Sequence, residues 1–95
     1  MRKRRNKLQT IADMLEESKR SNCRYSHIMY GANLNTKATN GYLDILVKSR
    51  LLEKNGEFYD NTRKGINFLF KYGKHNQTLK ELEEMLLPVE PNIIL

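Results

Sequence analysis

Residues 26–48 read SHIMYGANLNTKATNGYLDILVK, with two short amphipathic segments on either side of a cluster of turn-forming residues. In the first segment, Ser26 has the side chain of a helix N-cap, because its hydroxyl can accept a hydrogen bond from a free backbone N–H. We therefore expect a helix over residues 27–32, with Ile28 and Met29 as its buried residues.

The turn follows at Ala32-Asn33-Leu34-Asn35, where small and amide side chains replace most of the apolar ones. Asn35 or Thr36 can cap the next helix. The apolar residues of that helix share one side with Thr39 and recur at helical spacing: Tyr42, Leu43, Leu46 and Val47. A helix, a tight turn and a second helix together predict a helix-turn-helix motif.

Another amphipathic helix is expected before the motif, running roughly over residues 6–20. Its apolar side chains recur at the i, i+3, i+4 and i+7 positions of one helical face: Leu8, Ile11, Ala12 and Leu15. Charged residues occupy its other faces, and Ser21 and Asn22 end the periodicity. This pattern predicts a helix with one buried face.

A β-hairpin is expected after the motif, because Asn55-Gly56 separates two short segments that contain apolar residues. Asn-Gly is favoured in a type I′ turn, in which both central residues have positive φ. We therefore expect strands over residues 51–54 and 57–60, joined as a small wing. Asn61 then breaks the pattern, and Thr62 is suited to cap a final helix.

Two apolar stripes run along the final helix. The first consists of Ile66, Leu69 and Phe70, and we expect it to pack on the domain. The second alternates spacings of four and three residues, as a heptad seam does. We expect it to form a dimer interface with a partner helix, through Phe68, Tyr72, His75, Leu79, Leu82 and Leu86. Pro88 ends this helix and leaves a short, partly apolar tail.

The order helix, helix, turn, helix, hairpin, helix predicts a winged helix-turn-helix, a mostly α fold with a small β-hairpin wing. We divide the chain into a basic arm (1–5), a winged helix-turn-helix domain (6–65), a C-terminal dimerisation helix (66–87) and a tail (88–95). The chain has 95 residues, which is too short for most enzyme folds that need two lobes or a large sheet.

The sequence resembles the small archaeal winged-helix DNA-binding proteins, the Sulfolobus-type ten-kilodalton chromatin family. The most specific stretch is residues 26–34, and further similarity lies in 41–46, 51–53 and 62–65. The resemblance spans roughly residues 7–87. It implies a winged-helix fold, nucleic-acid binding, and an antiparallel two-helix coiled coil between the C-terminal helices of two subunits.

Lysine and arginine outnumber aspartate and glutamate by 17 to 11, which gives a net charge of +6. Residues 1–78 hold 16 of these basic side chains and only 7 of the acidic ones, so a polyanion is attracted to this part of the chain. The single cysteine, Cys23, cannot form an internal disulfide and fits a reducing interior. No apolar run approaches the roughly 18 residues of a membrane span. We expect a cytoplasmic, nucleoid-associated protein.

The second helix of a helix-turn-helix enters the major groove of DNA with its early exposed residues. There, Asn40 can pair with adenine and Lys37 can reach guanine or a phosphate; the alternatives are contacts to phosphates only, or plain solvation. The basic arm either follows the DNA backbone or is a solvated tail. The candidate DNA-binding residues are Arg2, Lys3, Arg4, Arg5, Ser26, His27, Asn35, Thr36, Lys37, Asn40, Gly41, Lys48, Arg50, Lys54 and Asn55.

These features predict a dimeric DNA-binding protein that acts on double-stranded DNA as a transcription regulator or a chromatin-type architectural protein. The alternative is a winged-helix module that binds another protein without contacting DNA. Neither function is enzymatic, because the sequence has no glycine-rich phosphate loop and no paired nucleophile and base. His27 and His75 are far apart and Cys23 is isolated, so we expect no metal, cofactor or small-molecule ligand.

Overall fold

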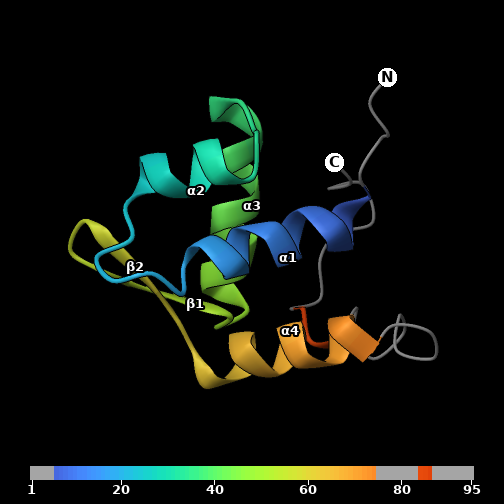
Figure 1. The fold of residues 1–95 in the computed structure, drawn as a ribbon. Helices are drawn as coiled ribbons and strands as arrows, with labels where there is room; N and C mark the ends of the chain where they lie inside the picture. The colour runs from blue at the N-terminus through green and yellow to red at the C-terminus, as the bar shows by residue number, and fades with distance from the viewer. Residues whose placement is uncertain (1–5, 75–83, 87–95) are drawn as a thin grey trace.

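The computed structural model describes residues 6–74 and 84–86 (Figure 1). It contains, in order, α1 (Lys7–Glu17), α2 (Tyr25–Gly31), α3 (Thr36–Lys48), β1 (Leu52–Asn55), β2 (Phe58–Asn61) and α4 (Arg63–Lys74). The mostly helical architecture with a two-stranded antiparallel wing is therefore confirmed. The basic arm, the tail, and His75, Leu79 and Leu82 of the expected seam lie outside the described residues.

Helix α1 is the centre of the fold, with α2 on one side and α4 on the other (Figure 1). It begins at the N-cap Asn6, whose side-chain oxygen accepts a hydrogen bond from the backbone N–H of Gln9 at 2.7 Å. Its predicted apolar face is buried and consists of Leu8, Ile11, Ala12 and Leu15. Met14 is buried beside them. This face therefore holds α2 and α4 on one shared core.

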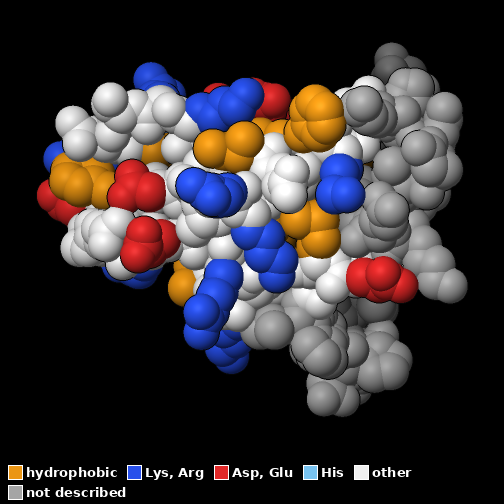
Figure 2. Space-filling model, turned by 90° about the horizontal axis from the view of Figure 1, so that it is seen from below, with side chains coloured by type: hydrophobic (Ala, Val, Ile, Leu, Met, Phe, Trp, Pro, Cys, Tyr) orange, Lys and Arg blue, Asp and Glu red, His pale blue; other side chains and the backbone are white. Residues whose placement is uncertain are grey.

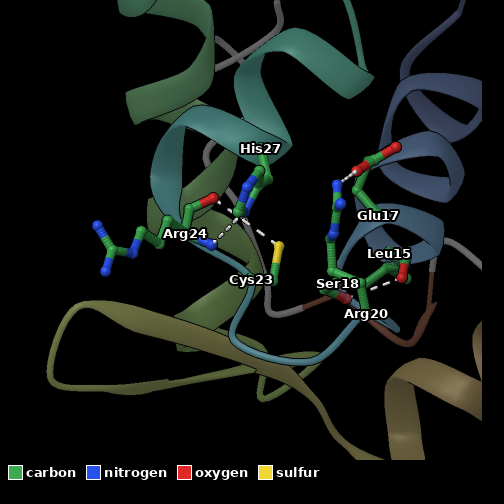
Figure 3. Close-up of polar contacts among 7 residues, drawn as sticks. All are labelled: Leu15, Glu17, Ser18, Arg20, Cys23, Arg24 and His27. Carbon is green, nitrogen blue, oxygen red and sulfur yellow. Dashed lines mark hydrogen bonds and ion pairs between the residues drawn. The ribbon is translucent and has the colours of Figure 1, made fainter.

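Helix α2 begins earlier than the sequence suggests, and Ser26 is not its N-cap. The N-cap is Arg24, whose backbone N–H donates a hydrogen bond to Nδ1 of His27 at 3.0 Å (Figure 3). The imidazole thus takes the role that a glutamate has in a capping box, reaching back to the N-cap from three residues along. Ile28 is buried as expected, while Met29 is only half-buried.

The turn between α2 and α3 confirms the helix-turn-helix. Asn33 adopts a φ of +57°, and the N–H of Leu34 donates to the carbonyl of Met29 at 2.9 Å, as in a Schellman motif. Asparagine tolerates this left-handed conformation better than most residues. Asn35 then caps α3, since its side-chain oxygen accepts from the N–H of Ala38 at 2.8 Å.

Helix α3 ends in a second Schellman motif, which has an arginine at the position that usually favours glycine. The N–H of Leu51 donates to the carbonyl of Leu46 at 2.9 Å, and Arg50 has a φ of +65°. A left-handed arginine costs on the order of 1 kcal/mol relative to a relaxed backbone. The hydroxyl of Thr62 donates to the carbonyl of Arg50 at 2.6 Å and fixes the end of α3 next to the start of α4.

The wing forms as expected, but each strand lies one residue later than predicted. Asn55 pairs with Phe58, so the central residues of the turn are Gly56 and Glu57 rather than Asn55 and Gly56. Only Gly56, with a φ of +65°, has positive φ, which is the pattern of a type II′ turn and not of type I′. The glycine of the Asn-Gly pair therefore makes the turn, and the asparagine ends β1.

Thr62 caps the start of α4, as expected, since the N–H of Gly65 donates to the Thr62 hydroxyl at 3.0 Å. Of the first apolar stripe, Leu69 packs against the core as expected, but the places of Phe68 and Phe70 are reversed. Phe68, expected at a dimer interface, is fully buried in the core of its own chain, whereas Ile66 and Phe70 are 54% and 62% exposed. The assignment of Phe68 to the interface is therefore wrong.

The close approach of Gly65 to the rest of the domain explains this reversal. A side chain at Gly65 would overlap the carbonyl oxygen of Leu51, so this side of α4 faces inward. Phe68 is three residues further along the helix and lies on the same face, whereas Phe70 does not. Leu86 is also buried in this core, which corrects its place in the interface, and Tyr72 is half-buried against the same core.

Candidate nucleic-acid interface

The start of α3 presents a polar face to solvent. Thr36, Lys37 and Asn40 are exposed, and Gly41 beside them is half-buried. In the part of the chain that the structure describes, no atom of another element lies within 4 Å of where a Cβ at Gly41 would lie. The opposite face is fixed in the core by four buried residues: Thr39, Tyr42, Leu43 and Leu46. The structure therefore gathers the candidate residues of this helix on one surface. Asn35 is exposed next to them, but its side-chain oxygen is used in capping the helix.

Asn40 is held by a residue that was not among the predicted site residues. The hydroxyl of Tyr25, the first residue of α2, donates a hydrogen bond to Oδ1 of Asn40 at 2.8 Å. The same hydroxyl lies 3.4 Å from the backbone carbonyl of Thr36. The carboxamide of Asn40 is therefore oriented from the neighbouring helix, 15 residues away in sequence.

A groove separates α3 from the wing. Its walls are formed by Asn40, Leu43, Asp44, Val47, Lys54 and Tyr59. The ammonium of Lys54 donates to the carbonyl of Gly56 at 2.7 Å and lies 5.5 Å from the centre of the Tyr59 ring. Asn55 donates to a carboxylate oxygen of Asp60 at 2.6 Å, so both predicted wing residues have contacts within the wing.

Lys48 lies further along α3 and is exposed. Its ammonium is 3.3 Å from a carboxylate oxygen of Asp44, one helical turn earlier. An exposed pair of this kind contributes little to stability, so the lysine can exchange this partner for a phosphate at small cost. Asp44 places one negative charge in this groove, beside the single cationic side chain of Lys54.

A second groove continues from the first around the end of α3 to the start of α4. It shares Val47 and Lys54 with the first groove, and its other walls are Arg50, Leu52, Glu53, Thr62, Arg63 and Lys64. We call it the basic groove, because four cationic side chains line it against the single carboxylate of Glu53. Figure 2 shows Lys and Arg side chains gathered near the middle of this underside of the molecule.

Arg63 and Lys64 were not among the residues expected to bind DNA. They occupy the first turn of α4, and Lys64 also donates to the carbonyl of Ser49 at 2.9 Å, which ties α4 to the end of α3. Two adjacent basic residues directly after the N-cap Thr62 were visible in the sequence. Their proximity to Arg50 and Lys54 was not, because it depends on how α4 packs.

Ser26 and His27 do not line either of the two grooves. Ser26 is exposed, whereas Nδ1 of the half-buried His27 accepts the capping hydrogen bond from Arg24 (Figure 3). The side chain of Arg24 is directed to the wing, with its guanidinium 5.5 Å from the ring of Phe58 and 3.7 Å from the carboxylate of Glu57. His27 therefore has a structural role at the start of α2.

The described residues show little reactive chemistry. Burial raises the pKa of the Cys23 thiol, and the nearby carboxylate of Glu17 raises it further, so the thiol stays protonated at neutral pH. Within 6–74 and 84–86, no cluster of His, Cys, Asp and Glu is arranged to hold a metal ion. None of the helices in these same ranges is both long and apolar enough to cross a bilayer.

The comparison with protein families agrees with this geometry. A family model described as winged helix-turn-helix matches residues 4–81. The chain belongs to the winged helix-turn-helix family. Proteins of this family generally bind DNA. The second helix of the motif in this chain is α3. No curated protein matches the sequence.

Proposed function

We propose that this winged helix-turn-helix protein binds double-stranded DNA with α3 in the major groove and the basic groove on the phosphate backbone. The observation that carries the proposal is the continuity of the two surfaces. The polar face of α3 opens into a groove that leads to Arg50, Lys54, Arg63 and Lys64. Base edges and phosphates of one duplex are adjacent in the same way, so one DNA segment can contact both.

Different residues of this surface have different tasks in the proposal. Asn40 and Lys37 lie where base edges enter, so they read sequence, and Thr36 assists them. Arg50 and Arg63 neutralise phosphates and provide affinity without sequence preference. The basic arm, Arg2 to Arg5, adds phosphate contacts. Both a transcription regulator and a chromatin-type architectural protein use such a surface, and we propose a role in one of these two classes.

A salt series tests the proposal directly. We expect the wild-type protein to bind a random duplex of about 20 base pairs with an affinity that falls steeply with salt, by a log–log slope of about −0.9 per phosphate contacted. Arg63→Gln removes one of these contacts, so its slope should be shallower by about one. Fluorescence anisotropy at four or five salt concentrations provides the slopes.

Lys19→Gln is the matched control for this experiment. Lys19 is exposed just beyond the end of α1 and pairs with Glu16 at 3.3 Å, and it lines neither groove, so its replacement removes the same charge elsewhere on the surface. We expect its slope to equal that of the wild type. Equal slopes for all three proteins would refute a role for the basic groove. An absence of binding even at low salt would instead favour the module that binds a protein partner.

We also propose that the protein is a homodimer. Ile66 and Phe70 lie one turn apart on α4, and both are largely exposed, which leaves an apolar stripe that a second copy of α4 can cover. In this proposal, Ile66 and Phe70 take the place of Phe68 in the dimer interface, because Phe68 is buried in the core of its own chain. Two copies joined through α4 would place two recognition helices at a fixed separation on DNA.

Light scattering tests the dimer. The wild-type protein should have twice the mass of the chain at micromolar concentration, and Phe70→Lys should be monomeric because a charge on the stripe cannot be desolvated cheaply. Tyr30→Lys is the control, since Tyr30 is 75% exposed on α2 and its replacement should leave the dimer intact. A monomeric wild type would contradict the proposal.

A further inference from the structure

Tyr25 contacts the exposed carboxamide of Asn40 through its hydroxyl. The phenol is half-buried and packs against the hydrophobic core, so its position is fixed by the fold. Its hydroxyl reaches Oδ1 of Asn40 at 2.8 Å, a good distance for a hydrogen bond between two uncharged groups. A hydroxyl has one proton, and the carboxamide has two chemically different ends. Donation to Oδ1 therefore leaves Nδ2 as the end that is directed away from Tyr25.

We propose that Tyr25 is a positioning residue for base recognition, and that it presents Nδ2 of Asn40 as a donor to N7 of a purine. The inference rests on the proposed DNA binding by α3. In the major groove, both adenine and guanine expose N7 as an acceptor, whereas pyrimidines have no acceptor at that place. Oδ1 keeps a second lone pair beside the one that Tyr25 occupies, and that lone pair can accept from N6 of adenine. The order of preference is therefore adenine, then guanine, then the pyrimidines.

The hydrogen bond from Tyr25 orders the side chain of Asn40 before DNA binds. An exposed asparagine otherwise rotates about two bonds and can present either end of the amide, and ordering it at the interface weakens binding. The hydrogen bond from Tyr25 selects one end in the free protein. Phosphate contacts do not depend on this choice, so Tyr25 affects base preference and leaves the electrostatic part of binding unchanged.

The experiment uses the full chain and a duplex obtained by selecting tight binders from a random library. Asn40→Ala identifies the base pair that Asn40 reads, because the preference at that position disappears. Wild type and Tyr25→Phe are then compared on duplexes with a purine, a pyrimidine or a 7-deazapurine at that position. Loss of one oriented hydrogen bond should reduce the purine preference of Tyr25→Phe by roughly three- to tenfold.

The 7-deazapurine separates recognition through N7 from other effects. Replacing the purine by 7-deazapurine should weaken DNA binding by the wild type by roughly three- to tenfold. The same replacement should not change DNA binding by Asn40→Ala. Tyr30→Phe is the matched control, since it removes a phenolic hydroxyl from the same helix at an exposed position. Thermal unfolding of Tyr25→Phe should stay close to that of the wild type, because the ring is kept.

The outcomes distinguish this inference from the proposed function. If no duplex binds at low salt, the proposed function itself fails. Salt-dependent binding with no base preference in the wild type would overturn the inference alone. The same holds if Tyr25→Phe keeps the full purine preference, or if the 7-deazapurine duplex binds the wild type as tightly as the purine duplex does. A shallower salt slope in Tyr25→Phe would also contradict it, because positioning leaves the phosphate contacts intact.

Discussion

Replacing Phe68 with alanine should lower the free energy of unfolding by about 3–5 kcal/mol, because it removes a fully buried ring and leaves a cavity. The same change at Phe70, two residues away on the same helix, should alter the stability of the folded chain by about 0.5 kcal/mol or less, since that ring is largely exposed. Urea unfolding followed by circular dichroism measures both values.

The two phenylalanine variants also separate folding from association. If the stripe with Phe70 joins two copies, the apparent stability of the wild type rises with protein concentration, whereas that of Phe70→Ala does not. The apparent stability of Phe68→Ala should still rise with protein concentration under conditions in which this variant is folded. Equal losses of stability for the two variants, measured at a concentration where the wild type is monomeric, would show that α4 is not rotated with Phe68 inward and Phe70 outward.

The second large effect is expected at Gly65. A methyl group there would overlap the backbone carbonyl of Leu51 and the side chain of Asn61, and a backbone carbonyl cannot move aside without shifting β1. We expect Gly65→Ala to destabilise the fold by about 1–3 kcal/mol, despite the higher helix propensity of alanine. Thermal or urea unfolding would measure this loss.

Gly73→Ala is the control for helix propensity. Gly73 lies on the same helix, and among the described residues no atom of another element lies within 4 Å of the position that an added methyl group would take. Alanine should therefore stabilise the protein by up to about 1 kcal/mol. Opposite signs at the two glycines would establish that α4 packs against Leu51, the residue before β1. A stabilising effect at Gly65 would contradict that contact.

Much of the fold could be predicted because its elements are encoded locally. Asn35 caps α3 and Thr62 caps α4 through side-chain hydrogen bonds within three residues, which a sequence pattern can capture. Gly56 marks the turn of the wing, although its neighbour Asn55 misled the prediction of turn type. The periodic apolar residues of α1 and α3 face the core as expected, since one helical face dominates in each.

The remaining features depend on contacts between distant segments. Phe68 and Phe70 are equally apolar, and which of them is buried depends on how α4 packs, including the close approach of Gly65 to Leu51. The capping of α2 by His27 has no common sequence pattern, so Ser26 was the stronger candidate from residue type alone. The hydrogen bond from Tyr25 to Asn40 joins residues of two helices whose crossing is not encoded in either one.

The wing has one further consequence, for how copies of the protein can pack against each other. The outer edge of β2 is covered, since the N–H of Tyr59 donates to the carbonyl of Cys23 at 2.8 Å and Phe58 pairs with Arg24. The strand β1 has only four residues, and its exposed side chains include the charged Glu53 and Lys54. Short, charged or covered edges resist strand addition from another chain. The hairpin is thus protected from sheet-type aggregation, even where many copies of the protein are crowded together.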